Sequence, residues 1–150
     1  MEFSLYFLDT DTCIDLLRIS PERIPPEIGH LKQESIVVSS VVLAELETGV
    51  RKSERPEVHA RRLSFLVSHV TLAAFDAGAA RVYGEIRSHL EKKGKSIGLL
   101  DLLIAAHARS LGAILVTGNV REFRRVPKLQ CLSWKISRES VKHRKDKGEY

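Results

Sequence analysis

The chain has 150 residues, of which 43% are hydrophobic and 29% charged. This composition supports one compact domain and excludes fibrous and disordered proteins. No apolar run approaches the roughly 20 residues of a membrane-spanning helix, and the first residues lack the basic segment of a secretion signal, so we expect a cytoplasmic protein with no membrane partner.

The net charge of +5 is distributed unevenly along the sequence. Residues 1–50 contain three basic and nine acidic residues, residues 51–100 contain ten and five, and residues 101–150 contain eleven and five. Such clustering occurs on ordinary solvated surfaces, and also in enzymes that combine an acidic, cation-binding pocket with a surface for polyanions. Composition alone does not decide between these interpretations.

Residues 1–134 predict one folded domain, and residues 135–150 predict a basic, flexible C-terminal tail. In the domain, β-branched runs alternate with amphipathic segments of helical period. In chain order these predict a strand over 4–8, a helix over 12–18, a loop or broken helix over 20–33, a strand over 35–39, helices over 40–52 and 58–68, a strand over 70–72, helices over 76–93 and 99–111, and strands over 113–116 and 129–132. This order favours an α/β fold, a three-layer α/β/α sandwich with a central parallel sheet of four to five strands.

The segment LLDLLIAAHARSL at residues 99–111 predicts a helix buried on several sides, because it is apolar almost all round. Asp101 lies in its first turn. A carboxylate in such a helix costs several kcal/mol unless it is paired, hydrogen-bonded or bound to a metal. A capping role at the helix N-terminus is the simpler alternative. We interpret His107, on the same helix, as a hydrogen-bonded core residue.

Polar residues follow several of the apolar runs, at positions that a parallel sheet brings to one edge. Asp9 follows the first strand, and Thr117 and Asn119 follow the fourth. Glu45 lies in the helix after the second strand, and Asp101 begins the helix that leads into the fourth. Individually, Asp9 also fits an ordinary turn, and Thr117 and Asn119 fit ordinary capping. Three acids at one edge together favour a hard cation such as Mg²⁺ or Mn²⁺, which takes oxygen ligands.

Glu45 is a better ligand candidate than Glu47, on the other flank of the same apolar stripe. Glu47 has Arg51 four residues further along the helix and can form a surface ion pair with it. Glu45 has Gly49 at the corresponding position, which leaves its carboxylate without a partner on the helix.

Four motifs occur in order along the domain: LDTDTC at 8–13, SSVVLAELETGV at 39–50, IGLLDLLIAAHARSLGAILVTGN at 97–119 and REFRRVPKLQCLSW at 121–134. Together they resemble the PIN-domain ribonucleases and, more narrowly, the VapC-type toxins of bacterial toxin–antitoxin pairs. The resemblance covers nearly the whole domain. It implies that residues 1–134 form a PIN-like nuclease domain.

The resemblance implies a divalent-metal-dependent endoribonuclease with Mg²⁺ or Mn²⁺ as cofactor. Its metal ligands would be Asp9, Glu45 and Asp101, with Glu122 in REF as a fourth catalytic acid, and Thr117 and Asn119 would lend polar support. Family members cut RNA, often a tRNA, are neutralised by a cognate antitoxin that fills the active-site groove, and are commonly homodimers. Two positions depart from the family pattern: Asp11, where Asn is usual, and Gly118, in a TGN triplet where TNN is usual.

Three basic residues are candidates for contacts with RNA phosphates, which supply affinity without sequence information. They are Arg87, Lys52 and Lys93. We prefer Arg87, which lies beside the apolar stripe of its helix. A solvated helix face is the simpler interpretation of each residue taken alone.

Two other functions are compatible with parts of the sequence. The DTDT run at residues 9–12 also suits a phosphatase of the haloacid-dehalogenase type, but the acidic pair that such an enzyme needs does not follow Thr117. Replacing Asp11 by Asn separates the two, since only the phosphatase uses that residue as its general acid. A non-catalytic RNA- or protein-binding module is the other alternative, and the retained acids argue against it.

Overall fold

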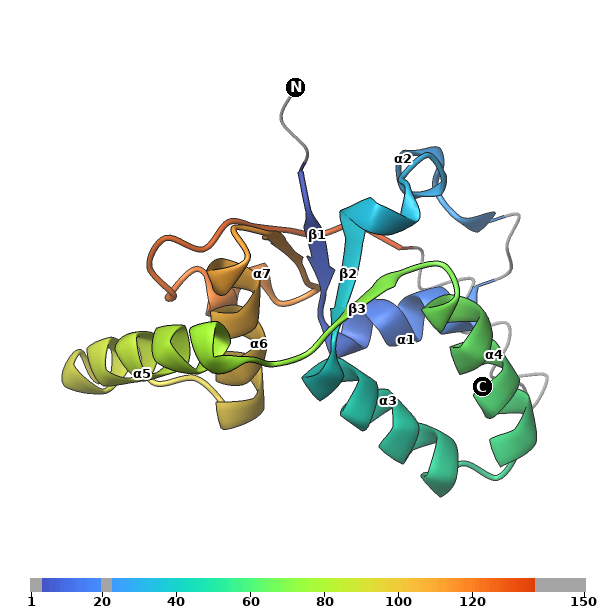
Figure 1. Ribbon diagram of the computed structural model, residues 1–150, viewed down its shortest axis with the longest axis horizontal. Helices are drawn as coiled ribbons and strands as arrows, with labels where there is room; N and C mark the ends of the chain where they lie inside the picture. Colours follow the sequence, from blue (N-terminus) through green and yellow to red (C-terminus); the bar gives the residue numbers. More distant parts are fainter. Residues whose placement is uncertain (1–3, 20–22, 137–150) are drawn as a thin grey trace.

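A computed structural model describes residues 4–19 and 23–136 of the chain (Figure 1). All but the first two residues of the predicted tail, 135–150, therefore lie outside the described residues. Within the described ranges, no helix is both long and apolar enough to cross a membrane.

Five parallel strands form one central sheet in the order β3-β2-β1-β4-β5. Their bounds are β1 Tyr6–Leu8, β2 Ile36–Ser39, β3 Thr71–Ala73, β4 Ile114–Val116 and β5 Cys131–Leu132. The order confirms the predicted parallel sheet, at the upper end of the expected strand number. Because β1 and β4 are parallel neighbours, their carboxyl ends lie at the same edge of the sheet.

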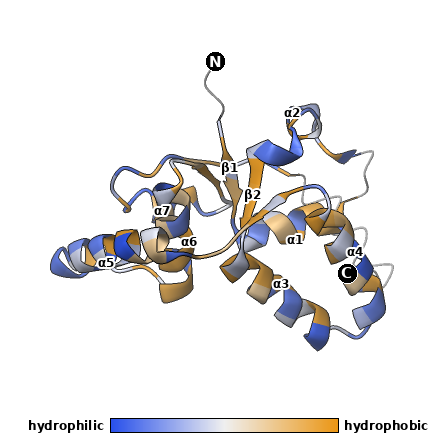
Figure 2. Cartoon of the chain, viewed as in Figure 1, coloured by the Kyte–Doolittle hydropathy of each residue, from blue (hydrophilic) through white to orange (hydrophobic). Residues whose placement is uncertain are grey.

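Helices cover both faces of the sheet. Their bounds are α1 Thr10–Arg18, α2 Pro26–Gly29, α3 Ser40–Lys52, α4 Pro56–Val67, α5 Ala77–Lys92, α6 Leu99–Ser110 and α7 Val120–Phe123, with a 3₁₀ turn at Gln33–Ser35. In Figure 1, α1, α3 and α4 lie on one side of the sheet and α5, α6 and α7 on the other. Figure 2 shows the most hydrophobic residues on the strands and on helix faces turned toward them.

Helix α1 begins at Thr10 rather than residue 12, because the Asp9 side chain caps it. Helix α7 (Val120–Phe123) was not predicted, since a single turn shows no helical period. The proline-rich segment contains a short helix that starts at Pro26, where proline is tolerated in the first turn, which agrees with the predicted loop or broken helix.

Helix α6 is the central helix of its layer, as the apolar composition predicted. Most of its residues after the first turn are buried, although Leu99 at its start is 57% exposed. His107 is 1% exposed, and its Nδ1 lies 2.8 Å from the Ser39 hydroxyl oxygen. Its ring packs edge-on against Phe7 and Phe75. The predicted hydrogen-bonded core role of His107 is therefore confirmed.

Burial lowers the pKa of His107 below its usual 6.5, against a smaller opposing effect of Asp76. Because the folded state holds this imidazole neutral, its contribution to stability is present above pH 6.5 and is lost as pH falls below that value. We expect the free energy of unfolding to depend more steeply on pH between about 7.5 and 5.5 in the wild type than in His107→Gln. Urea unfolding of both proteins at the two pH values measures the difference. An equal pH dependence of the free energy of unfolding in both proteins would contradict a neutral, buried His107.

Candidate active site

The first acid of the site, Asp9, links strand β1 to helix α1. Its carboxylate accepts a hydrogen bond from the backbone N–H of Thr12 (2.8 Å) and is almost fully buried. The Asp9 N–H and the Thr12 hydroxyl both donate to the Val116 carbonyl of β4, each at 3.1 Å. Burial raises the pKa of Asp9, and hydrogen bonds from Thr117 and Thr12 oppose the rise. The two neighbouring strand ends therefore hold this carboxylate in one orientation.

The second acid, Asp101, lies in the first turn of α6, as predicted. Its pKa is raised from 3.8 to about 6, mainly by burial and then by the negative charges of Glu122, Asp9 and Asp11. Acids from α1, α6 and α7 thus lie within electrostatic range of one another. Their mutual repulsion adds to the effect of burial on the Asp101 carboxyl.

Glu122 and the predicted polar residues form a connected chain of hydrogen bonds. The Asn119 side-chain amide donates to the Glu122 carboxylate by a short hydrogen bond. The Asn119 backbone N–H donates to the Thr117 hydroxyl at 2.9 Å, and Thr117 is 1% exposed. Thr117 in turn bonds Asp9. The structure therefore brings together five of the predicted residues: Asp9, Asp101, Glu122, Thr117 and Asn119.

The structure does not bring Glu45 into this group. Glu45 is exposed on α3, and it is not among the charges that raise the pKa of Asp101. Its competitor Glu47 lies 3.8 Å from Arg51, so the predicted surface ion pair is present. The ion pair of Glu47 is therefore confirmed, whereas the role of Glu45 as a metal ligand stays a prediction.

Among the described residues, no three His, Cys, Asp or Glu side chains are arranged closely enough to hold a metal ion. The chemistry of the donors nevertheless fits Mg²⁺ or Mn²⁺, since Asp9, Asp101 and Glu122 offer only oxygen ligands and mutually repelling charges. Magnesium keeps several of its waters and needs only one or two direct carboxylates. The residues present therefore fit such an ion without a closed triad.

The two departures from the family pattern have different consequences. Asp11 is exposed in the first turn of α1, and its charge contributes to the raised pKa of Asp101. Asp11 therefore adds to the repulsion between the negative charges at the site. At Gly118 an added side chain would meet open space, and the backbone there needs no glycine. An asparagine at position 118 would fit, so this departure leaves the fold of the loop unaffected.

The three basic residues predicted to contact phosphates lie at scattered positions. Arg87 donates to Glu91 (2.8 Å) and to the Tyr83 hydroxyl (3.1 Å) on its own helix. Lys52 ends α3, and Lys93 caps the C-terminus of α5. These three residues therefore do not form one basic surface. The basic residues that flank Glu122 in the sequence were not among the predicted phosphate contacts.

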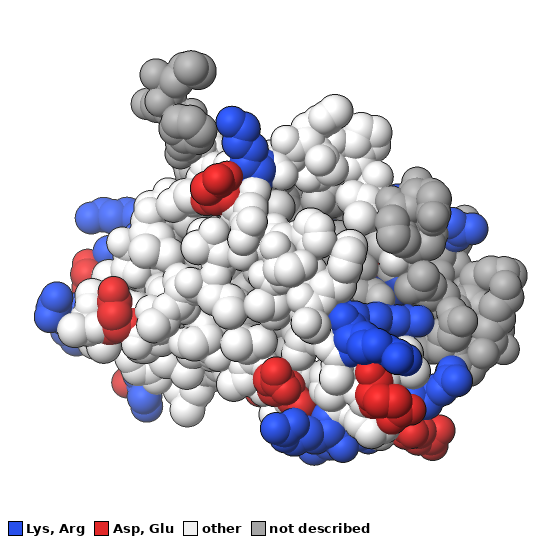
Figure 3. Space-filling model, turned by 45° about the vertical axis from the view of Figure 1, so that its right-hand side comes forward, with Lys and Arg blue, Asp and Glu red and all other residues white. Residues whose placement is uncertain are grey.

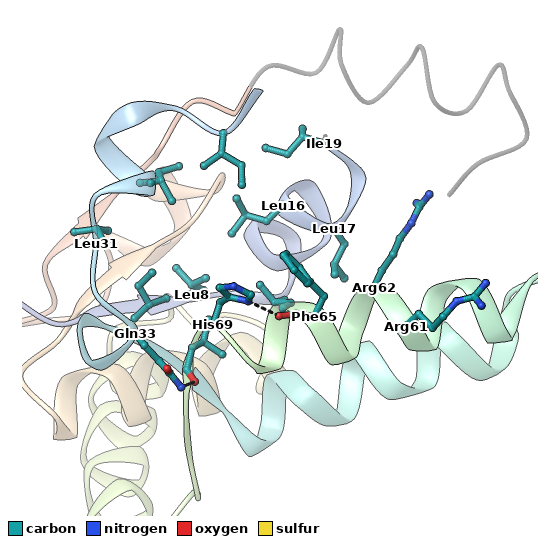
Figure 4. Close-up of a pocket in the computed structure, with 16 residues that line it drawn as sticks. Leu8, Leu16, Leu17, Ile19, Leu31, Gln33, Arg61, Arg62, Phe65 and His69 are labelled. Carbon is teal, nitrogen blue, oxygen red and sulfur yellow. Dashed lines mark hydrogen bonds between the residues drawn. The ribbon is translucent and has the colours of Figure 1, made fainter. Parts of the chain in front are cut away.

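An apolar groove of about 570 Å³ is a further feature that the sequence did not indicate. It lies between α1, α2 and α4, and Figure 4 shows Leu16, Leu17 and Leu31 pointing into it, with Arg61 and Arg62 on α4 beside it. None of the acids of the site lines it. The groove and the acid site are therefore separate features of this domain.

At the mouth of the groove, Phe65 is 61% exposed. Its ring packs on His69, with centroids 4.4 Å apart, and the His69 Nδ1 lies 2.8 Å from the Phe65 carbonyl oxygen. This bond is dashed in Figure 4. The groove and the exposed Phe65 ring together form an apolar surface, of the kind that is typical of interaction sites.

A family model for the PIN domain matches residues 6–129. Ribonuclease VapC2 of Rickettsia felis is 40% identical over 131 residues, which span 87% of this chain and 98% of the relative. The tRNA(fMet)-specific endonuclease VapC of Shigella flexneri is 40% identical over 129 residues, which span 86% and 97%.

Solved structures agree with the sequence comparisons. DNA-bound VapBC from Salmonella typhimurium matches with a TM-score of 0.81 at 37% identity, covering 87% of this chain and 98% of that chain. VapBC2 from Rickettsia felis, bound to a promoter DNA fragment, matches with a TM-score of 0.78 at 36% identity and the same coverage. Both the sequence and the arrangement of its strands and helices show that the chain belongs to the PIN domain family, within its VapC ribonuclease group.

Proposed function

We propose that this VapC-type toxin is an endoribonuclease that hydrolyses RNA phosphodiester bonds with Mg²⁺ or Mn²⁺ as cofactor. The observation that carries the proposal is the clustering of Asp9, Asp101 and Glu122 at one edge of the sheet, in a chain 40% identical to ribonucleases. If the substrate is cellular RNA, the protein acts in the cytoplasm, and we propose that location.

The residues of the site have separate roles in this proposal. Asp9 and Asp101 would hold the cation, which when bound lowers the pKa of a water nucleophile and neutralises charge that develops on the phosphate. The hydrogen bonds from Thr12 and Thr117 favour the ionised form of Asp9. Asn119 orients the Glu122 carboxylate. Glu45, which is exposed on α3 and outside this group of acids, stays a predicted ligand.

Incubation of the antitoxin-free protein with total cellular RNA tests this function. We expect discrete cuts with Mg²⁺ or Mn²⁺ and none with EDTA, because the carboxylates repel the phosphate unless a cation is present. Mapping the new 5′ ends identifies the substrate, which we propose to be a tRNA because one relative is named for tRNA(fMet). A folded protein that leaves all RNA intact with either cation would favour the non-catalytic binding module.

The partner is the second part of the proposed function. Several structural neighbours are VapBC assemblies, which supports a cognate antitoxin for this chain. We assign the antitoxin to the apolar groove, whose lining suits an amphipathic segment and whose arginines suit an acidic flank. Since no acid of the site lines the groove, inhibition requires that the antitoxin extend beyond it. The homodimer expected from the family stays a prediction.

A further inference from the structure

The short helix α7 and the turn that follows it carry three arginines on one side. Arg121, Arg124 and Arg125 are spaced at i, i+3 and i+4, and the helical turns continue to Arg125, whose N–H donates to the Glu122 carbonyl at 3.1 Å. All three are exposed. The opposite side of the segment is fixed in the core by Phe123 and Val126, at 1% and 2% exposure. We call these three arginines the arginine face.

The arginine face shares its segment with the acid Glu122, and no arginine is among the charges that act on the pKa of Asp101. Glu122 is part of the same helical turn, and its carboxylate pairs with the Asn119 amide rather than with an arginine. In the part of the chain that the structure describes, neither Arg121 nor Arg124 forms an ion pair with an acid. The guanidinium groups of Arg121 and Arg124, on the segment that also carries Glu122, therefore remain available for an anion from outside the protein.

The third arginine extends the basic surface to the loop that precedes α6. Arg125 Nη1 lies 3.5 Å from the Ser96 carbonyl oxygen. The same loop carries the exposed residues Lys93 and Lys95, and it leads directly into the turn that holds Asp101. A basic tract thus runs from the turn after α7 to the loop that precedes α6, the helix whose first turn carries Asp101.

We propose that the arginine face binds the backbone phosphates of the RNA next to the phosphate that is cleaved. This inference rests on the proposed function, because the acid site defines where the scissile phosphate lies. Guanidinium groups suit this role, since their planar donors bind phosphate in pairs. Arg87, the residue preferred from the sequence, is less suitable because its guanidinium already bonds Glu91 and Tyr83.

Binding measured without cleavage tests the inference. Fluorescence anisotropy of labelled tRNA in EDTA compares the wild type with the double variant Arg121→Gln/Arg124→Gln. We expect about tenfold weaker binding at low salt. Each lost phosphate contact reduces the steepness with which log K falls with log salt by about 0.7 to 0.9. The double variant should therefore reduce this steepness by about 1.4 to 1.8. Arg125 is left in place because it supports the loop.

Two further variants control for charge and for folding. The exposed Arg81 lies 11 residues before the end of α5, about 16 Å along the helix from the basic loop. Arg81→Gln should change the slope of log K against log salt by less than half of the value expected for one phosphate contact. The double variant Arg121→Lys/Arg124→Lys keeps both positive charges, so it should retain most of the wild-type affinity.

Steady-state cleavage then separates this inference from the proposed function. Removing contacts made equally in the ground and transition states raises KM and leaves kcat within about twofold. Wild-type cleavage with unchanged KM and salt slope in the double variant Arg121→Gln/Arg124→Gln would overturn the arginine face and leave the nuclease intact. Wild type that binds tRNA through the arginine face but cuts no RNA would instead overturn the proposed function.

Discussion

Replacement of Asp101 by Asn is expected to make the protein more stable and inactive. In EDTA at about pH 7.5, the free energy of unfolding should rise by about 1 kcal/mol, after allowance for solvent screening of this partly exposed group. RNA cleavage should fall by about 100-fold or more, because the site loses a proposed metal ligand. Chemical unfolding and single-turnover cleavage measure the two effects.

The sign of the stability change follows from the raised pKa of about 6. The folded state holds the Asp101 proton more tightly than the unfolded chain, whose carboxyl has the usual pKa of 3.8. Ionised Asp101 therefore destabilises the folded state above about pH 6, and the penalty disappears as pH falls to about 3.8. The stability gain of Asp101→Asn should be full at about pH 7.5 and absent near pH 3.8.

Glu47→Gln is the matched control, because it removes one exposed carboxylate that lies on α3 and does not contribute to the raised pKa of Asp101. It should leave both stability in EDTA and cleavage close to the wild type. Addition of Mg²⁺ should stabilise the wild type and Glu47→Gln more than Asp101→Asn. If Asp101→Asn were less stable than the wild type in EDTA, the account of a repulsive acid site would be wrong.

Replacement of Phe65 by Glu is expected to weaken antitoxin binding by about 30-fold or more. This corresponds to about 2 kcal/mol, a loss typical of an aromatic residue that anchors an interface. Phe65 is 61% exposed, so the fold should tolerate the change. Calorimetric titration with the cognate antitoxin measures the affinity.

Leu111→Glu places the same charge on an exposed leucine outside the groove and serves as the control. It should bind antitoxin like the wild type. RNA cleavage by Phe65→Glu should also stay unchanged, because Phe65 lies outside the acid site, and antitoxin should inhibit this variant only at higher concentration. Equal affinity of Phe65→Glu and the wild type would place the antitoxin elsewhere on the domain.

In the face shown in Figure 3, basic and acidic side chains surround a broad area without charged residues. The apolar groove suits the proposed antitoxin and the basic tract suits the proposed RNA substrate.

The sequence alone determined the fold class and most of the acid site. Strand and helix periods are local properties, so alternating patterns were enough to predict a parallel sheet. Asp9 and Asp101 could be placed together because the carboxyl ends of parallel strands share one edge. The motif REF added Glu122, which the structure connects to Asn119 and Thr117.

Only the tertiary structure decided what depends on packing between distant segments. Helix α7 is too short to show a period, and burial of Phe123 and Val126 turns its arginines outward. The groove is formed by α1, α2 and α4, whose residues are separated in sequence and meet only on folding. Glu45 faces solvent because helical period selects a side of a helix but not the neighbour it faces. Local patterns specify elements, whereas sites built between elements follow from how those elements pack.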